Sequence, residues 1–283
     1  MKATADFCYI NGKIMLYQDA KLHISDLGLL RSYGLFDFFR TQNGKPFLMQ
    51  QHLNRFRKAV SKMGLYLPIN EAEIKKIIFL LLAKNGHSES GIKLLLTGGY
   101  SEDSITPNEP NFIIKVNSYA FSYQETQRKG VKLLTYSYQR DFPEIKSLNY
   151  FVPVFERKLY QQKKAFDILY HHQNEIRELS RSNFFLIKDN VIITPSKEIL
   201  FGITRQKIME LVQKEFKIEE RVVLLSEINS ADEAFLTSSG RKILPITKID
   251  NQLIGNGKVG AATQKIMELF ATYEKEYSSD YLK

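Results

Sequence analysis

The chain of 283 residues has a single cysteine, Cys8, which excludes an internal disulfide framework and a cysteine-based zinc site. No apolar run approaches the roughly 20 residues of a membrane-spanning helix, so we expect no membrane partner. The start has no basic segment followed by a long apolar run, so we expect no signal peptide and a cytoplasmic protein. HExxH, GxSxG and Walker motifs are absent, and we predict no metal site.

The formal net charge of +9 arises from 40 Lys and Arg against 31 Asp and Glu. A basic balance can indicate a nucleic-acid partner when the cations gather on one surface. Here they are spread along the chain, and the densest stretch, Arg157 to Lys164, fits one solvated helix face. We therefore expect no nucleic-acid partner. A small acidic substrate or a phosphate group needs only one or two well-placed cations.

The first part of the chain predicts a small α+β domain over residues 1–117. Asn11-Gly12 and Asn43-Gly44 lie between β-forming residues and predict two tight hairpins. Two helices follow, and Asn70, with Glu71 and Glu73, is suited to begin the second. The expected elements are strands around Phe7 to Leu16, Leu22 to Asp26, Leu35 to Thr41, Pro46 to Leu48, Gly91 to Thr97 and Asn111 to Val116, and helices His52 to Gly64 and Ile69 to Gly86.

Residues 118–128 have no clear period and predict an interdomain linker, so the second domain covers residues 129–283. This domain mixes strands and helices in alternation. Its expected helices are Tyr150 to Ala165, Thr204 to Phe216 and Gly260 to Tyr277.

Five short stretches carry side chains suited to a carbonyl or anionic ligand. Lys146 lies between Ile145 and Leu148 where a strand gives way to a helix, and loss of water there favours a neutral, nucleophilic amine. Lys146 also fits a solvated cap at the end of an element, and each of the others also fits a structural role, as a turn, a solvated loop, a helix N-cap or a surface arginine. They are Glu178 to Asn183, Gly202-Ile203-Thr204-Arg205, Thr237-Ser238-Ser239-Gly240 and Arg55.

Taken in order, these stretches resemble the class IV (fold-type IV) aminotransferases, which use pyridoxal 5'-phosphate. The group includes D-amino-acid aminotransferase, branched-chain aminotransferase and aminodeoxychorismate lyase. The resemblance covers nearly the whole chain, and Lys146-Ser147-Leu148-Asn149 is most similar to the D-amino-acid form of the lysine motif. The other matching stretches are Tyr9 to Lys13, Ser25 to Gly28, Gly34 to Asp37, His52 to Phe56, Glu178 to Asn183, Gly202 to Arg205, Thr237 to Ser239 and Asn256 to Gly260.

The resemblance implies roles for the residues of a cofactor site. Lys146 would form the Schiff base and then move the substrate α-proton as base and acid. Glu178 would keep the pyridine nitrogen protonated, while Arg55 and the donors of Thr204 would hold the phosphate. The further cofactor-binding residues that it implies are Tyr150, Ser182, Asn183, Leu200, Ile203, Ser238 and Ser239.

The resemblance also implies the fold, the reaction and the assembly. The fold would be α+β, with a small N-terminal α+β domain, a larger C-terminal α/β-type domain and the cofactor in the cleft between them. The reaction would move an amino group between an amino acid, of branched-chain or D-amino-acid type, and a 2-oxo acid in a homodimer. Two alternatives are an aminodeoxychorismate lyase that releases pyruvate and a non-catalytic binding protein on the same scaffold.

The candidate substrate residues depart from the family pattern. Phe36 and Asp37 stand where the family usually has an aromatic residue followed by glutamate. Gly98 stands where the D-amino-acid and lyase groups often have an arginine that helps to bind the substrate carboxylate. We therefore expect a different cation to bind that carboxylate. The candidates are Arg31, Arg40 and Arg181.

Overall fold

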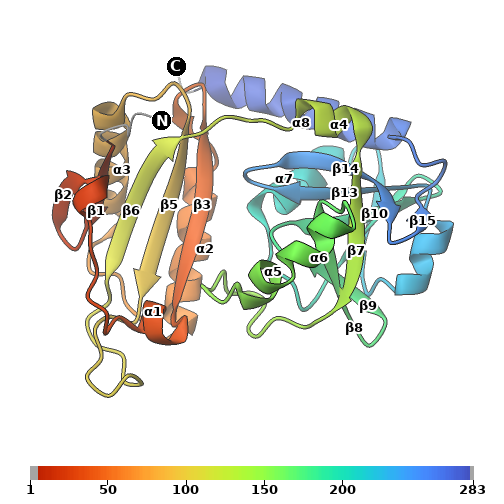
Figure 1. Cartoon of the computed structure of the whole chain (residues 1–283). Coiled ribbons are helices and arrows are strands. Elements are labelled where there is room, and N and C mark those ends of the chain that lie inside the picture. Colours follow the sequence, from red (N-terminus) through yellow and green to blue (C-terminus); the bar gives the residue numbers. More distant parts are fainter. Residues whose placement is uncertain (1–5, 281–283) are drawn as a thin grey trace. The chain divides into compact units, whose positions relative to one another are not determined.

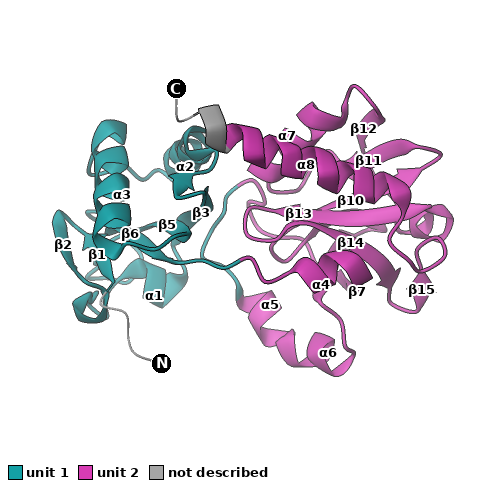
Figure 2. Cartoon of the chain, turned by 90° about the horizontal axis from the view of Figure 1, so that it is seen from above, with its two compact units in different colours: residues 1–120, 145–150 teal, residues 121–144, 151–283 magenta. Residues whose placement is uncertain are grey.

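The computed structural model describes residues 6–280, and the chain divides into two compact units (Figures 1 and 2). The first unit contains the described residues up to Ala120 together with Ile145–Tyr150. The second contains Phe121–Glu144 and the chain from Phe151 onward. The expected division at residues 118–128 therefore differs from the structure, because residues from Phe121 already belong to the second unit and six residues from the middle of the chain return to the first.

The first unit is an antiparallel sheet with two long helices on one face (Figure 1). The strand order is β2-β1-β6-β5-β3-β4. The hairpins at Asn11-Gly12 and Asn43-Gly44 are confirmed, and all four residues have positive φ, as tight turns of this type require. The elements are β1 (Phe7–Ile10), β2 (Lys13–Leu16), η1 (Tyr17–Asp19), α1 (Leu27–Arg31), β3 (Gly34–Gln42), β4 (Lys45–Pro46), α2 (Met49–Lys62), α3 (Glu71–Asn85), β5 (Ser90–Thr97) and β6 (Phe112–Ser118).

The core of the first unit lies between this sheet and helices α2 and α3. Alternate residues of each central strand point into it, among them Leu35 of β3 and Ile92 of β5, while the residues between them lie on the opposite face. Helix α3 begins where the sequence predicts, with a capping box between Asn70 and Glu73, and Gly86 ends it with φ 63°. These local signals fix the helix so that its apolar stripe meets the sheet.

The second unit is built on a nine-stranded mixed sheet of order β12-β11-β10-β13-β14-β7-β8-β9, with β15 paired to β14. Helices α7 and α8 both contact β13. The elements are α4 (Gln124–Lys129), β7 (Val131–Ser137), α5 (Phe151–Phe155), α6 (Arg157–Gln162), β8 (Asp167–His172), β9 (Glu175–Leu179), β10 (Asn183–Lys188), β11 (Val191–Pro195), α7 (Ile203–Val212), β12 (Lys217–Arg221), η2 (Leu225–Ser230), β13 (Glu233–Ser238), β14 (Lys242–Ile249), β15 (Gln252–Leu253) and α8 (Ala261–Asp280).

Three expected elements differ from the structure. The stretch Leu22 to Asp26 is not a strand, because the Asp26 side chain accepts a hydrogen bond from Gly28 N at 2.8 Å and caps α1. The expected linker contains α4, whose Gln127 side chain donates to the Ile243 carbonyl at 3.0 Å. The expected helix from Tyr150 to Ala165 is two short helices, α5 and α6, separated at Glu156.

In the described part of the chain, no helix combines the length and the apolar character that crossing a membrane needs.

Candidate active site

Lys146 lies in an extended segment that joins the edge of the first sheet. Its carbonyl accepts a hydrogen bond from Phe36 N at 2.9 Å, and Leu148 N donates to the Gly34 carbonyl at 2.9 Å. Ile145, 6% exposed, packs into the core of the first unit. Because side chains alternate along an extended chain, Lys146 projects to the face away from the core. Its Nζ lies 4.8 Å from the centre of the Phe36 ring.

Arg55 and Asp37 form a bidentate ion pair beneath this region. Arg55 Nε and Nη2 lie 2.9 and 2.8 Å from the Asp37 carboxylate oxygens, and His52 Nδ1 lies 2.8 Å from Oδ1. Asp37 is 1% exposed. Burial raises the pKa of Asp37, but Arg55 and His52 outweigh it and hold the pKa well below its usual range. Burial lowers the pKa of His52 against the pull of Asp37, so the imidazole is neutral at neutral pH.

This geometry separates two residues that the sequence groups together. Phe36 lies on the sheet face that carries Lys146, and its ring centre is 5.7 Å from that of Tyr150. Asp37, the next residue, points the opposite way and orients the Arg55 guanidinium. The structure thus places Asp37 as a buried partner of Arg55, whereas the sequence suggests a substrate contact.

Gly98 is held between other groups, which explains why it is glycine. Its N–H donates to the Tyr33 carbonyl at 3.0 Å. A Cβ at this position would lie 2.6 Å from Tyr33 Cδ1 and 3.1 Å from Leu27 Cδ1. A side chain at position 98 would therefore require the Tyr33 ring to move.

In the second unit, Glu178 is a buried carboxylate, 4% exposed, near the end of β9. Arg140 Nη1 lies 2.6 Å from its Oε1. The Leu200 N–H donates to Oε2 at 3.1 Å, and Asn183 Nδ2 lies 3.4 Å from the same oxygen. Asn183 also donates to the Leu200 carbonyl at 2.7 Å. The structure therefore brings together Glu178, Asn183 and Leu200, and adds Arg140, which sequence reasoning did not select.

Helix α7 begins beside this cluster at the stretch predicted to bind an anion. Gly202, not Thr204, occupies the N-cap, and no side chain caps the helix. Asn183 Oδ1 lies 2.1 Å from where a Gly202 Cβ would be, so only glycine allows this close approach. The first N–H groups of α7, including those of Ile203 and Thr204, have no carbonyl partner within the helix and can serve an anion.

Ser182 and Ser238 are joined through Arg241, a second residue that sequence reasoning missed. Arg241 Nη1 donates to Asp167 Oδ2 at 2.7 Å and to Ser182 Oγ at 3.3 Å, and its backbone N–H donates to Ser238 Oγ at 3.2 Å. Ser180 donates to the other Asp167 oxygen at 2.5 Å. Since both Ser182 and Ser238 accept through their hydroxyls here, each retains a hydrogen to donate. Ser239, half-buried, follows in the same turn.

The three arginines proposed to replace the missing cation are not equivalent. Arg40 is 3% exposed and donates to the Thr41 carbonyl at 3.2 Å and to Gln42 at 2.7 Å. Arg31 is exposed at the end of α1 and donates to the Leu30 carbonyl, while Arg181 is exposed in the turn between β9 and β10. Arg40 is thus buried with polar contacts in its own strand and the Phe47 ring centre 4.8 Å away, whereas Arg31 and Arg181 are exposed residues of different units.

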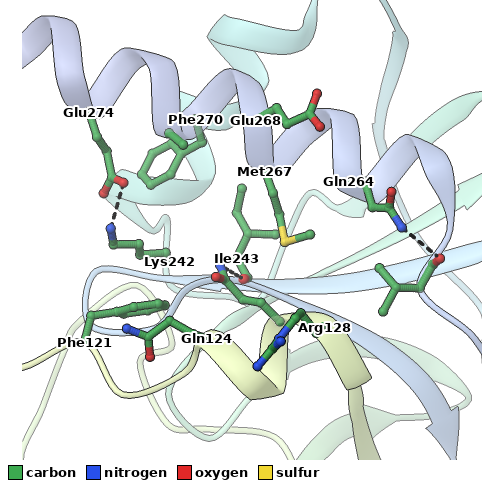
Figure 3. A pocket seen from close by; sticks show the side chains of 13 residues that line it. Phe121, Gln124, Arg128, Lys242, Ile243, Gln264, Met267, Glu268, Phe270 and Glu274 are labelled. Carbon is green, nitrogen blue, oxygen red and sulfur yellow. Dashed lines mark hydrogen bonds and ion pairs between the residues drawn. The ribbon is translucent and has the colours of Figure 1, made fainter.

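A separate cavity of about 590 Å³ lies between α4, the start of β14 and α8 (Figure 3). Phe121 and the ion pair of Lys242 with Glu274, at 2.8 Å, lie at one end of it. It contains none of the predicted site residues. The lining residues are Phe121, Gln124, Gln127, Arg128, Lys242, Ile243, Val259, Gln264, Met267, Glu268, Phe270, Ala271 and Glu274.

Comparisons with known proteins agree over nearly the whole length. Residues 34–249 match the family model described as amino-transferase class IV. The chain is 30% identical over 269 residues to a D-alanine aminotransferase of Bacillus licheniformis, covering 90% of this chain and 93% of that protein. It shares its fold with a branched-chain amino acid aminotransferase of Escherichia coli, at TM-score 0.89, 22% identity and coverage of 95% and 94%. A T.th. branched-chain amino acid aminotransferase with pyridoxamine 5'-phosphate also has TM-score 0.89, at 21% identity with the same coverage.

Proposed function

The chain belongs to the class IV aminotransferases, and we propose that it transfers an amino group between an amino acid and a 2-oxo acid with pyridoxal 5'-phosphate as cofactor. The predicted family and fold class are thereby confirmed. The observation that carries the proposal is the placement of Lys146, whose backbone is paired with the sheet edge while its side chain stays on the face away from the core. The backbone pairing with β3 therefore fixes the position of the Lys146 backbone in the structure without a ligand.

The residues present fit this cofactor. Lys146 would bond to its aldehyde carbon, and Glu178 would face its ring nitrogen. The phosphate would take donors from Arg55, the N-terminus of α7 and the Ser182 and Ser238 hydroxyls. When bound, the cofactor supplies an electron-withdrawing ring that stabilises negative charge at the substrate α-carbon.

The protein's own groups would supply orientation and proton transfer. Lys146 Nζ would hold and return the substrate α-proton. Arg140 contacts one oxygen of the Glu178 carboxylate, and the Leu200 N–H donates to the other. These contacts hold the carboxylate in one orientation. The Asp37 carboxylate fixes the Arg55 guanidinium in the same manner. Because these side chains are already oriented, less conformational entropy would be lost when the substrate binds.

We further propose a substrate of the branched-chain or D-amino-acid type, a homodimeric assembly and a cytoplasmic location. The relatives named for D-alanine and for branched-chain amino acids support the substrate range. Gly98 cannot carry the arginine of the D-amino-acid and lyase groups without displacing Tyr33, so carboxylate binding must differ from those groups.

Absorbance spectroscopy with borohydride reduction tests the assignment. Protein saturated with pyridoxal 5'-phosphate should be yellow, and reduction should attach the cofactor to the peptide that contains Lys146. Lys146→Ala should lose the band while keeping the fold, whereas the matched control Lys13→Ala, an exposed strand lysine, should keep it. If the wild-type protein stays colourless, both catalytic hypotheses are wrong, and only the hypothesis of a non-catalytic binding protein remains. Bleaching by aminodeoxychorismate alone, with pyruvate release, would establish the lyase instead.

A further inference from the structure

The face of the first sheet that points away from α2 and α3 carries a row of cations. Ile92, Ile114 and Ile145 point into the core, so their chain neighbours Lys93, Lys115 and Lys146 all lie on the other face. They come from β5, from β6 and from the segment that joins the edge of β3.

Lys93 and Lys115 are directly opposite each other in the β5–β6 pairing. Like charges at such a position are unfavourable, because the two Cβ atoms lie only about 5 Å apart. Among residues 6–280, the structure gives neither ammonium group a carboxylate partner, and their contacts are aromatic. Lys93 Nζ lies 5.1 Å from the Phe36 ring centre, and Lys115 Nζ lies 3.8 Å from that of Tyr17.

Lys93 shares the Phe36 ring with Lys146. Their nitrogens lie 5.1 and 4.8 Å from the same ring centre, so both belong to one small region of the sheet face. Loss of water around the ammonium group, with the charges of Lys115 and Lys146, lowers the pKa of Lys93. The region therefore holds an excess of positive charge, and binding an anion there would relieve the repulsion.

We propose that Lys93, with Lys115 beside it, binds the carboxylate of the amino-acid or 2-oxo-acid substrate. This assignment rests on the proposed function and names the cation that replaces the arginine missing at Gly98. Two features support it. The ring next to Lys93 is also next to the reactive lysine, and the three arginines considered from the sequence lie elsewhere or are bound to carbonyls.

Calorimetric titration with propionate and with glutarate tests the assignment without turnover, because neither anion carries an amino or keto group. Lys93→Met should weaken binding by about 10- to 100-fold, the usual effect of losing a charge-assisted hydrogen bond. Lys93→Arg should retain most of the affinity. The control Lys13→Met removes the same charge from an exposed strand position of the same unit and should bind both anions as the wild type does.

The two anions distinguish which carboxylate is bound. Weaker binding of both would assign Lys93 to the α-carboxylate, and weaker binding of glutarate alone would assign it to a second, side-chain carboxylate. If Lys93→Met binds both as tightly as wild type, the proposal is wrong. The cofactor band of each variant separates this outcome from failure of the proposed function, since Lys93→Met should retain the band. Its unfolding midpoint should be unchanged or slightly higher, because a like-charge contact is removed.

Discussion

Asp37→Asn tests whether the buried carboxylate beneath Lys146 organises the first unit. Asp37 Oδ1 accepts from His52 Nδ1, Arg55 Nη2 and Phe38 N, and Oδ2 accepts from Arg55 Nε. Asparagine keeps the shape but offers one oxygen. An amide nitrogen in the place of Oδ2 is a donor, so it could not accept the hydrogen bond from Arg55 Nε. The guanidinium charge would also lose its counterion.

The expected cost follows from the burial of the pair. Removing one member of a buried ion pair usually costs about 3–5 kcal/mol. Arg55 is 14% exposed, so water can partly compensate its charge, and we expect the lower end, about 3 kcal/mol. For a chain of this size, that corresponds to a fall of roughly 6–12 °C in the unfolding midpoint. Arg55 would also lose its fixed orientation, so cofactor affinity should fall.

Thermal and denaturant unfolding of the protein without cofactor measure the change in the free energy of unfolding separately from the change in cofactor affinity. The control is Asp19→Asn, which changes an exposed aspartate of the same unit and should leave stability within about 0.5 kcal/mol of wild type. Equilibrium dialysis against pyridoxal 5'-phosphate then measures the second effect. If Asp37→Asn unfolds like the control, the carboxylate does not stabilise the unit and the account of this cluster is incorrect.

Two further predictions concern buried charges. Burial lowers the pKa of His52, so the unfolded chain binds its proton more readily and the free energy of unfolding should fall as pH drops below about 6.5. Denaturant unfolding between about pH 5 and pH 7 should show a smaller slope for His52→Gln, and equal slopes would contradict the predicted direction. Arg241→Met should destabilise the second unit by about 3–5 kcal/mol, since it leaves Asp167, 1% exposed, without its cation. Arg241→Met with Asp167→Asn should recover part of that loss, and an additive double variant would argue against a coupled pair.

Much of the fold could be predicted because its signals are local. Asn-Gly pairs specify hairpins through positive φ, and Asn70 with Glu73 specifies a helix start, within four residues in each case. Periodicity predicted the two helices of the first unit for the same reason. The interruption near Glu156 was missed, because the one proline of this stretch, Pro153, lies inside α5 and not where the helices separate.

The candidate site could be predicted only in part, because its contacts join distant positions. The motif order predicted Lys146, Glu178 and the α7 stretch as site residues, and these roles stay predictions. It could not show that Asp37 of β3 pairs with Arg55 of α2, which depends on how the helix packs on the sheet. Arg241 was equally hidden, because its ionic partner lies 74 positions away in the sequence.

The return of Ile145–Tyr150 to the first unit places a lysine from the middle of the chain beside residues near the N-terminus. Two backbone hydrogen bonds to β3 and the buried Ile145 side chain fix this segment on the sheet edge. Alternation along the strands then decides which side chains accompany Lys146, and it selects Phe36 and Lys93 while turning Asp37 away. The chemistry that we propose for Lys146 would therefore depend on the register of this short pairing. A one-residue slip would place Ile145 on the open face and bury the lysine among apolar side chains.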